Sequence, residues 1–215
     1  MNILMVNGSP HRDGCTARAL HEVEEEFKIL GDNVIDNVWL GPQMNGCICC
    51  NVCKDKKLGH CVFDNDLVNR FIEKAETADG FIFASPVYYA GITGQLANFM
   101  SRVFYSAANV MRNKYAAGIT VSRRAGNELA FAHLNSYFLM HSMTVVGSQY
   151  WNEVHGDFPE ELEHDKEGLQ CMRRLAYNMH VAVHGQPEKP FEEKRIHTNF
   201  ISREFLKLYK EAENK

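Results

Sequence analysis

Five of the seven cysteines fall within one short stretch of this 215-residue chain. Cys47, Cys50 and Cys53 are separated by two residues each, and Cys61 follows after seven more. A close thiolate triplet with a more distant fourth can surround a cubane iron–sulfur cluster. Zinc can use the same four thiolates, although C-x2-C pairs joined by longer loops are its commoner arrangement. Free thiols are a third interpretation, and Cys49 is expected to lie beside the ligands rather than to be one.

A polar loop near the N-terminus is the second feature with chemical significance. Ile3–Val6 is an unbroken apolar run, typical of a strand buried on both faces, and Thr16–Phe27 has the apolar spacing of a helix. The loop between them directs backbone N–H groups and a helix N-terminus at one point, where a phosphate can bind. The residues that suit such a site are Ser9, His11, Gly14 and Thr16.

Three kinds of phosphate-binding loop compete for this stretch. The dinucleotide fingerprint G-x-G-x-x-G is incomplete, because Gly8 and Gly14 are the only glycines of the loop. A P-loop is also incomplete, because Cys15 follows Gly14 where the lysine would stand. The hydroxyl-rich loop of flavodoxin-like proteins needs small polar groups and little positive charge, and this loop supplies them. An ordinary turn after a strand is the remaining alternative.

Two further loops carry side chains suited to a flat ring. Ser85–Gly91 combines a rigid proline turn, two adjacent tyrosines and a glycine. Backbone amides can pin a ring there while an aromatic face covers it. Ser122–Gly126 follows the next predicted strand and contains Arg123 and Arg124. These two arginines can stabilise negative charge on a reduced ring, or they can lie solvated in the loop.

The elements that position these loops alternate between strands and helices. Strands are predicted at residues 3–6, 33–40, 80–84, 115–121 and 143–147, and helices at 16–27, 64–77, 95–107 and 127–141, with a last helix that begins near residue 159 or 165. Strands that are apolar on both faces and alternate with helices form a parallel sheet covered on both sides. We therefore predict a doubly wound α/β fold with a five-stranded parallel sheet. Such a sheet binds ligands beyond the carboxyl ends of its strands.

The composition divides the chain into one domain and a tail. Residues 1–185 are predicted to form a single domain with a cysteine-rich insertion at 41–61. Pro187 and Pro190 then interrupt the chain. The extension at 186–215 is predicted to contain an amphipathic helix, with its apolar side at Phe200, Ile201, Phe205, Leu208 and Tyr209.

Charge and hydropathy exclude several classes of partner. The formal net charge of −4 and pI of about 6.2, with no basic block, argue against nucleic acid and anionic membranes. No apolar run approaches the roughly 18 residues of a membrane span. The N-terminus leads directly into a strand without a charged export signal, so we expect a cytoplasmic protein. Crowded thiols fit the same reducing compartment.

Three motifs taken together resemble one known family. They are G-S-P-H-R-D-G-C-T at 8–16, S-P-V-Y-Y-A-G-I-T-G-Q-L-A-N-F-M-S-R at 85–102 and V-S-R-R-A-G-N-E at 121–128. They resemble the NAD(P)H-dependent FMN reductase and iron–sulfur flavoprotein branch of the flavodoxin-like superfamily, over about residues 1–185. The cysteine spacing resembles the compact motif of the iron–sulfur flavoproteins, closely in the triplet and more loosely in the last gap.

The resemblance implies FMN as a cofactor and gives each loop a role. The implied phosphate contacts are Ser9, His11, Gly14, Cys15 and Thr16. The implied contacts with one side of the isoalloxazine are Pro86, Val87, Tyr88, Tyr89 and Gly91, and those with another side are Ser122, Arg123, Arg124 and Gly126. The implied ligands of a [4Fe-4S] cluster are Cys47, Cys50, Cys53 and Cys61. Many relatives carry Arg or Lys in place of His11, and a small polar residue in place of Cys15, but neither departure removes an N–H cradle.

The implied activity is electron transfer through a flavin. NAD(P)H or a reduced ferredoxin-like donor reduces FMN, and the electrons leave either through the cluster or directly, to a small-molecule or protein acceptor. Two alternatives stay open: an NAD(P)H-dependent FMN, quinone or azo reductase without a cluster, and a non-enzymatic electron carrier or redox sensor. A homo-oligomer is expected, because relatives often place the flavin ring near a subunit boundary.

Two histidine pairs have the spacing of metal ligands on a helix. His133 and His141 lie eight residues apart, and His180 and His184 lie four apart. No carboxylate constellation accompanies either pair in the sequence pattern. We therefore expect surface or packing histidines rather than ligands.

Overall fold

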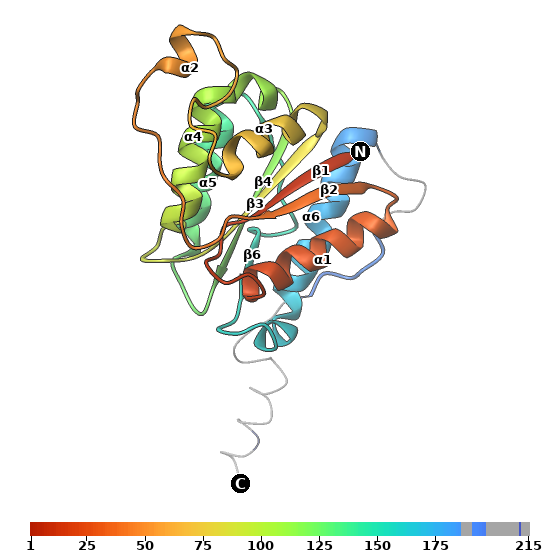
Figure 1. Ribbon diagram of the computed structural model, residues 1–215. Helices are drawn as coiled ribbons and strands as arrows, with labels where there is room; N and C mark the ends of the chain where they lie inside the picture. Colours follow the sequence, from red (N-terminus) through yellow and green to blue (C-terminus); the bar gives the residue numbers. More distant parts are fainter. Residues whose placement is uncertain (186–190, 197–210, 212–215) are drawn as a thin grey trace.

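The computed structural model describes residues 1–185, 191–196 and 211 of the chain (Figure 1). The strands are β1 (Asn2–Asn7), β2 (Asn33–Trp39), β3 (Gly80–Pro86), β4 (Tyr115–Ser122), β5 (Thr144–Val145) and β6 (Glu153–His155). The helices are α1 (Cys15–Ile29), α2 (Val52–Asp55), α3 (Leu67–Thr77), α4 (Gly94–Met111), α5 (Asn127–Met140) and α6 (Lys166–His184), with a 3₁₀ turn at Glu161–His164. The amphipathic helix predicted around residues 200–209 lies outside the described residues, so the proposed domain boundary at residue 185 stays a prediction.

The strands form the predicted parallel sheet, in the order β2-β1-β3-β4-β5. Helices α1 and α6 cover one face, and α3, α4 and α5 cover the other (Figure 1). The first face packs Leu20 and Phe27 against Met172 and Leu175, and all four side chains are buried. The second face is rich in phenylalanine. The doubly wound α/β fold is therefore confirmed.

The last sheet position differs from the prediction, because two short strands share it. β5 pairs with the first residues of β4, and β6, which lies in a segment predicted as loop, pairs with the last ones. Asn152 bridges the interruption and is fully buried. Its Nδ2 donates to the carbonyl oxygens of Gly118 at 3.1 Å and Val146 at 3.3 Å, and its own carbonyl accepts from Thr120 N–H at 3.0 Å. The side-chain amide and the backbone carbonyl of this one buried residue thus supply hydrogen bonds that a continuous strand would make.

The helix bounds also differ slightly from the prediction. The helix expected from residue 64 begins at Leu67, because the Asp66 side chain accepts a hydrogen bond from Val68 N–H and caps it. The last helix begins after Asp165, whose side chain accepts from Gly168 N–H. Among the helices that the structure describes, none is both long and apolar enough to cross a bilayer.

Candidate functional site

The loops that follow β1, β3 and β4 contact one another at the carboxyl edge of the sheet. Gly8 N–H donates to the Ala84 carbonyl at 2.9 Å, and the Thr93 hydroxyl donates to the Gly8 carbonyl at 2.6 Å. Val87 N–H donates to the Val121 carbonyl at 2.8 Å. Three segments that are distant in the sequence therefore form one continuous surface.

The first loop folds tightly over the start of α1. Ser9 N–H donates to Asn7 Oδ1 at 3.0 Å, and His11 N–H donates to Ser9 Oγ at 3.1 Å. A Cβ added at Gly14 would lie 3.2 Å from His11 Cβ, so this position has no room for a larger residue without adjustment. Gly14 is the N-cap of α1 and gives the helix no side-chain cap. The first N–H groups of α1 are therefore available to an anion.

Thr16 provides independent support for a ligand at this loop. The residue is 1% exposed. Its Oγ1 and Asn135 Oδ1 are the two buried side-chain polar atoms without a hydrogen-bond partner in the part of the chain that the structure describes. An unsatisfied buried hydroxyl costs about 1–3 kcal/mol. A phosphate oxygen at the N-terminus of α1 would accept this hydrogen bond and interact favourably with the helix dipole. The loop therefore fits a phosphate.

The second loop contains a tight turn between β3 and α4. Tyr88 N–H donates to the Gly91 carbonyl at 2.9 Å, and Gly91 N–H donates back to the Tyr88 carbonyl at 3.0 Å. The central residues Tyr89 and Ala90 have φ angles of 52° and 60°, in the left-handed region that is unfavourable for residues other than glycine. Such conformations concentrate at ligand sites. Both tyrosine side chains are at the surface, where a flat ring can reach them.

The third loop lies directly against the second. Gly126 has a φ of 95°, and an added Cβ would lie 3.2 Å from both Ala90 Cα and Val87 Cγ1. This position therefore requires glycine for its backbone angle and for its close approach. The Ser122 hydroxyl donates to Asn127 Oδ1 and is fixed at the base of the loop. The structure thus brings the predicted ring-binding segments into contact.

Arg123 and Arg124 are exposed and line a hollow beside these loops. Trp151 and His155 line the same hollow, from the segment around β6. Their side chains are therefore within reach of whatever binds at this edge of the sheet. Neither arginine has a described hydrogen bond that commits it to a structural role.

The Cys15 side chain is hydrogen-bonded to the backbone and favours its neutral form. Its thiol donates to the Gly156 carbonyl at 3.6 Å. Burial is the main cause that raises the pKa of the Cys15 thiol, and nearby carboxylates add to the effect. Burial and the contact with the Gly156 carbonyl therefore favour the neutral thiol at Cys15.

The four cysteines of the predicted motif line a second hollow, on the other side of α4 from the sheet. Cys47, Cys50, Cys53 and Cys61 all belong to its wall, whereas Cys49 does not. Cys53 and Cys61 are each 8% exposed, and all seven cysteines are free thiols. The structure therefore separates the odd thiol from the four whose spacing suggested a cluster.

The surroundings of these thiols favour a bound cation. Ile48, Val62 and Phe63 contribute an apolar wall. Burial, followed by the neighbouring thiols of Cys49 and Cys53, raises the pKa of Cys47. Several thiolates can coexist in such surroundings when a metal ion or cluster compensates their charge. The four thiols are a donor set suited to a cluster, but among the described residues their sulfur atoms do not form a group within 4.8 Å of one another, the spacing that a single ion needs.

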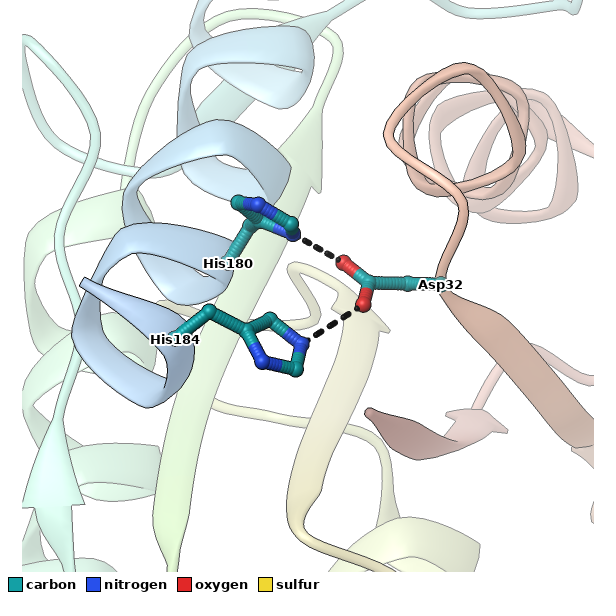
Figure 2. A group of neighbouring side chains, drawn as sticks. All are labelled: Asp32, His180 and His184. Atoms are coloured by element: carbon teal, nitrogen blue, oxygen red, sulfur yellow. Dashed lines mark hydrogen bonds and ion pairs between the residues drawn. The ribbon is translucent and has the colours of Figure 1, made fainter. Parts of the chain in front are cut away.

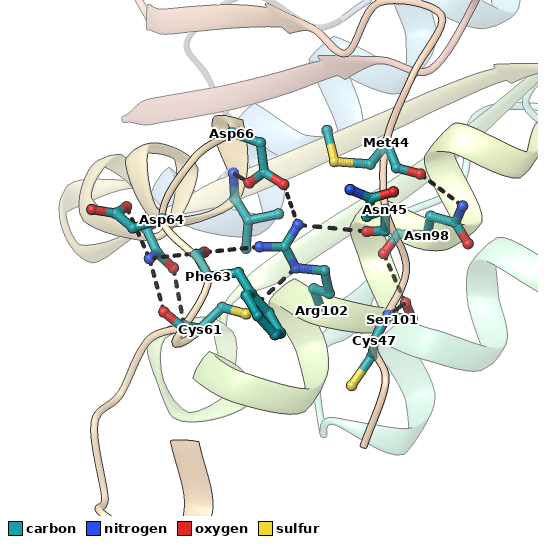
Figure 3. A network of polar contacts seen from close by, with 12 residues as sticks. Met44, Asn45, Cys47, Cys61, Phe63, Asp64, Asp66, Asn98, Ser101 and Arg102 are labelled. Carbon is teal, nitrogen blue, oxygen red and sulfur yellow. Dashed lines mark hydrogen bonds and ion pairs between the residues drawn. The ribbon is translucent and has the colours of Figure 1, made fainter. Parts of the chain in front are cut away.

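Helix α4 holds the cysteine insertion through a polar stripe (Figure 3). The stripe consists of Asn98, Ser101, Arg102 and Tyr105. These positions follow the i, i+3, i+4 and i+7 spacing of one helix face. Asn98 Nδ2 donates to the Met44 carbonyl at 2.8 Å, and Ser101 Oγ accepts from Cys47 N–H at 3.1 Å. The Tyr105 hydroxyl donates to Asn51 Oδ1 at 2.6 Å. The insertion is thus attached at several points along one helix.

Arg102 lies at the centre of this network (Figure 3). It is 2% exposed, and its Nε donates to Cys61 Sγ at 3.4 Å. Its guanidinium also donates to the Phe63 carbonyl at 2.9 Å and forms an ion pair with Asp66, the cap of α3. One buried cation therefore links a predicted ligand, the loop behind it and two helices.

Sequence reasoning did not identify the α4 stripe as part of a site. The available signal was polar residues at helical spacing within an otherwise apolar helix, with Arg102 on its buried side. That signal alone does not say which segment the stripe contacts, because the insertion has little regular structure from which to predict its path.

Comparison with known proteins agrees with this geometry. The family model for NADPH-dependent FMN reductase matches residues 1–157. An iron–sulfur flavoprotein of Methanocaldococcus jannaschii is 32% identical over 192 residues, covering 81% of this chain and 93% of the relative. An iron–sulfur flavoprotein of Methanosarcina thermophila is 30% identical over 184 residues, covering 82% and 92%. Among solved structures, a WrbA-like flavodoxin from Agrobacterium tumefaciens has a TM-score of 0.58 at 17% identity, covering 86% of this chain and 98% of that one.

The fold and the strand-end loops define a flavodoxin-like protein. More particularly, the chain belongs to the NADPH-dependent FMN reductase family, in the branch of the iron–sulfur flavoproteins. Family membership places it among the flavin oxidoreductases. The resemblance noted from the sequence motifs is therefore confirmed, whereas the assignment of individual site residues stays a prediction.

Proposed function

We propose that this protein binds FMN at the strand-end loops and a [4Fe-4S] cluster at the cysteine hollow, and that it transfers electrons from NAD(P)H or a reduced ferredoxin-like donor to an acceptor. The observation that carries this proposal is the hollow lined by the four spaced cysteines and not by Cys49, in a fold whose strand ends suit a flavin. The relatives named iron–sulfur flavoproteins support the same combination.

The phosphate of FMN is proposed to bind at the start of α1. Thr16 Oγ1 supplies a buried donor without a described partner, and the uncapped N–H groups of α1 supply others. Ser9 shapes the loop by accepting from His11 N–H. His11 takes the place of the Arg or Lys of many relatives, so backbone and hydroxyl groups carry most of the recognition.

The isoalloxazine is proposed to lie between the second and third loops. FMN supplies the ability to accept a hydride and to release single electrons. Tyr88 and Tyr89 provide aromatic surface, and the Gly126 contact with Ala90 fixes the spacing of the two loops. Arg123 and Arg124 are the cations placed to stabilise negative charge on a reduced ring.

The cluster is proposed to be held by Cys47, Cys50, Cys53 and Cys61. An iron–sulfur cluster in this place would exchange single electrons with a partner protein. Arg102 donates a hydrogen bond to the sulfur of Cys61, and its positive charge would offset part of the negative charge of a bound cluster. Such a centre requires a reducing compartment, which supports a cytoplasmic location.

A flavin reductase without a cluster is the second candidate function. The four free thiols would then hold zinc or remain unoccupied. A homo-oligomer is proposed for either candidate, since Leu129, Leu139 and Met140 give α5 an exposed apolar side.

Anaerobic reduction of the purified protein tests the proposed activity. NADH, NADPH and a dithionite-reduced ferredoxin are each added while the visible spectrum is recorded. We expect at least one of them to bleach the flavin absorbance at a rate that saturates with donor concentration. Failure of all three to reduce a bound flavin would contradict the proposed donor class.

A further inference from the structure

Figure 2 shows a cluster of three ionisable side chains. The cluster lies at the amino ends of the strands, opposite the flavin loops. Asp32 occupies the turn between α1 and β2, and His180 and His184 lie on the last turns of α6. Asp32 is 148 and 152 positions from the two histidines in the sequence, and the three residues meet because α1 and α6 pack side by side (Figure 1). The sequence analysis expected only a surface or packing role for this histidine pair. It did not predict that Asp32 would lie beside the two histidines.

The geometry is that of three convergent ligands. His180 Nδ1 lies 2.8 Å from one carboxylate oxygen of Asp32, and His184 Nε2 lies 3.1 Å from the other. All three ligand atoms lie within 4.8 Å of one another. Ligands around a tetrahedral zinc ion are roughly 3.3 Å apart at zinc–ligand distances of about 2.0–2.2 Å. Small side-chain rotations therefore convert this arrangement into a coordinating one.

The electrostatics of this cluster favour a cation. The Asp32 side chain is 2% exposed, so its negative charge is poorly solvated. Burial acts to raise the pKa of Asp32, but hydrogen bonds from the Met1 amino group, His180 and His184 hold it below its ordinary value. The carboxylate is therefore ionised near neutral pH. His184 also ends α6, where the helix dipole favours positive charge.

We propose that Asp32, His180 and His184 bind one divalent cation of the zinc class. Two imidazoles and a carboxylate are donors that zinc uses in proteins. The His184 side chain is 42% exposed and gives the ion access from solvent. The bound ion joins the α1–β2 turn to the end of α6 and stabilises the packing of these helices.

The Met1 amino group is the competing cation at this site. It lies 2.8 Å from Asp32 Oδ1 and 3.1 Å from His184 Nε2. It must move aside when the metal binds.

Equilibrium dialysis against zinc chloride, with elemental analysis of the retained metal, tests the proposal. The proteins compared are the wild type, a variant with His180→Gln and His184→Gln, and a matched control with His21→Gln and His133→Gln, which removes two exposed histidines elsewhere. We expect the wild type and the control to retain one more equivalent of zinc than the His180/His184 variant. Asp32→Asn should lower zinc affinity at least tenfold.

Equal zinc retention by the wild type and the His180/His184 variant would overturn the proposal and identify a hydrogen-bonded cluster without metal. Both proteins contain the same cysteines, and the test uses only the difference between their zinc contents. The result therefore does not depend on whether the cysteines carry iron, zinc or nothing. Retained FMN confirms that each variant is folded, because the flavin loops lie at the opposite edge of the sheet. Zinc should also raise the Tm of the wild type and leave that of the variant unchanged.

Discussion

The flavin loops and the cysteine insertion are positioned by different means. Backbone hydrogen bonds between strand ends join the flavin loops, as between Gly8 and Ala84 or Val87 and Val121. The insertion contains only the four-residue helix α2, and side chains of α4 attach it to the domain. The flavin site is therefore a consequence of the sheet, whereas the cysteine site depends on one helix and one buried arginine. Substitutions should separate the two sites.

Cys53→Ser should have the largest effect, because it removes a buried ligand of the proposed cluster. We expect iron and acid-labile sulfide to fall to near zero while FMN is retained, as measured on anaerobically purified protein. Cys49→Ser is the matched control and should keep its full iron content, because Cys49 lies outside the hollow. Loss of iron from Cys49→Ser but not from Cys53→Ser would show that Cys49, and not Cys53, is a ligand.

Thr16→Val should weaken FMN binding about tenfold or more, since a hydrogen bond to a charged group contributes about 1.5–3 kcal/mol. The same substitution removes an unsatisfied buried hydroxyl. The flavin-free variant should therefore unfold in urea with an unchanged or higher free energy of unfolding. Thr144→Val, at an exposed position of β5, is the control. Unaltered FMN affinity in Thr16→Val would remove Thr16 from the phosphate site.

Arg102→Lys should accelerate the loss of iron to a chelator several-fold and leave FMN in place. Lysine keeps the charge, but it cannot contact Cys61, Phe63 and Asp66 together. Arg112→Lys, at the exposed end of the same helix, is the matched control. Identical rates of iron loss in both variants would show that the guanidinium does not hold the cysteine site.

His155→Gln should have the smallest effect, a change in the free energy of unfolding. It tests whether the ion pair of His155 with Asp165, on the wall of the hollow beside the flavin loops, stabilises the fold. The Asp165 carboxylate, 3.6 Å from His155 Nδ1, raises the pKa of His155, against a smaller opposing effect of burial. The interaction is therefore fully stabilising below the ordinary histidine pKa of about 6.5, and it is lost as the pH rises through the raised folded-state pKa. We expect the substitution to lower the free energy of unfolding by less than about 1 kcal/mol at pH 5.5, and by still less at pH 9. An effect that grows with pH would contradict this assignment.

The sheet and the loops at its carboxyl edge were predictable because their signals are local. Ile3–Val6 is a continuous apolar run, and the polar loop after it follows directly in the sequence. A parallel topology then places the loop at the same edge as Ser85–Gly91. The same logic predicted five of the six strands that the structure describes, with small shifts in their bounds.

The features that escaped prediction depend on contacts between distant residues. β6 exists because Asn152 bridges an interrupted strand, and Arg102 acts through an insertion about 40 residues away from it. The two histidines at the end of α6 had a recognisable spacing, but Asp32 enters their neighbourhood only when α1 and α6 pack. A sequence pattern shows which donors a helix carries and leaves their partners undefined.

Metal, sulfide and flavin analysis of anaerobically purified protein tests the central claim most directly. Four iron atoms and four acid-labile sulfides for each FMN would establish that the two differently built sites hold two cofactors. FMN without iron or sulfide, or with zinc in their place at the cysteines, would contradict the cluster and leave a simple flavin reductase. Within the part of the chain that the structure describes, the one further metal expected is a single zinc that disappears with His180 and His184.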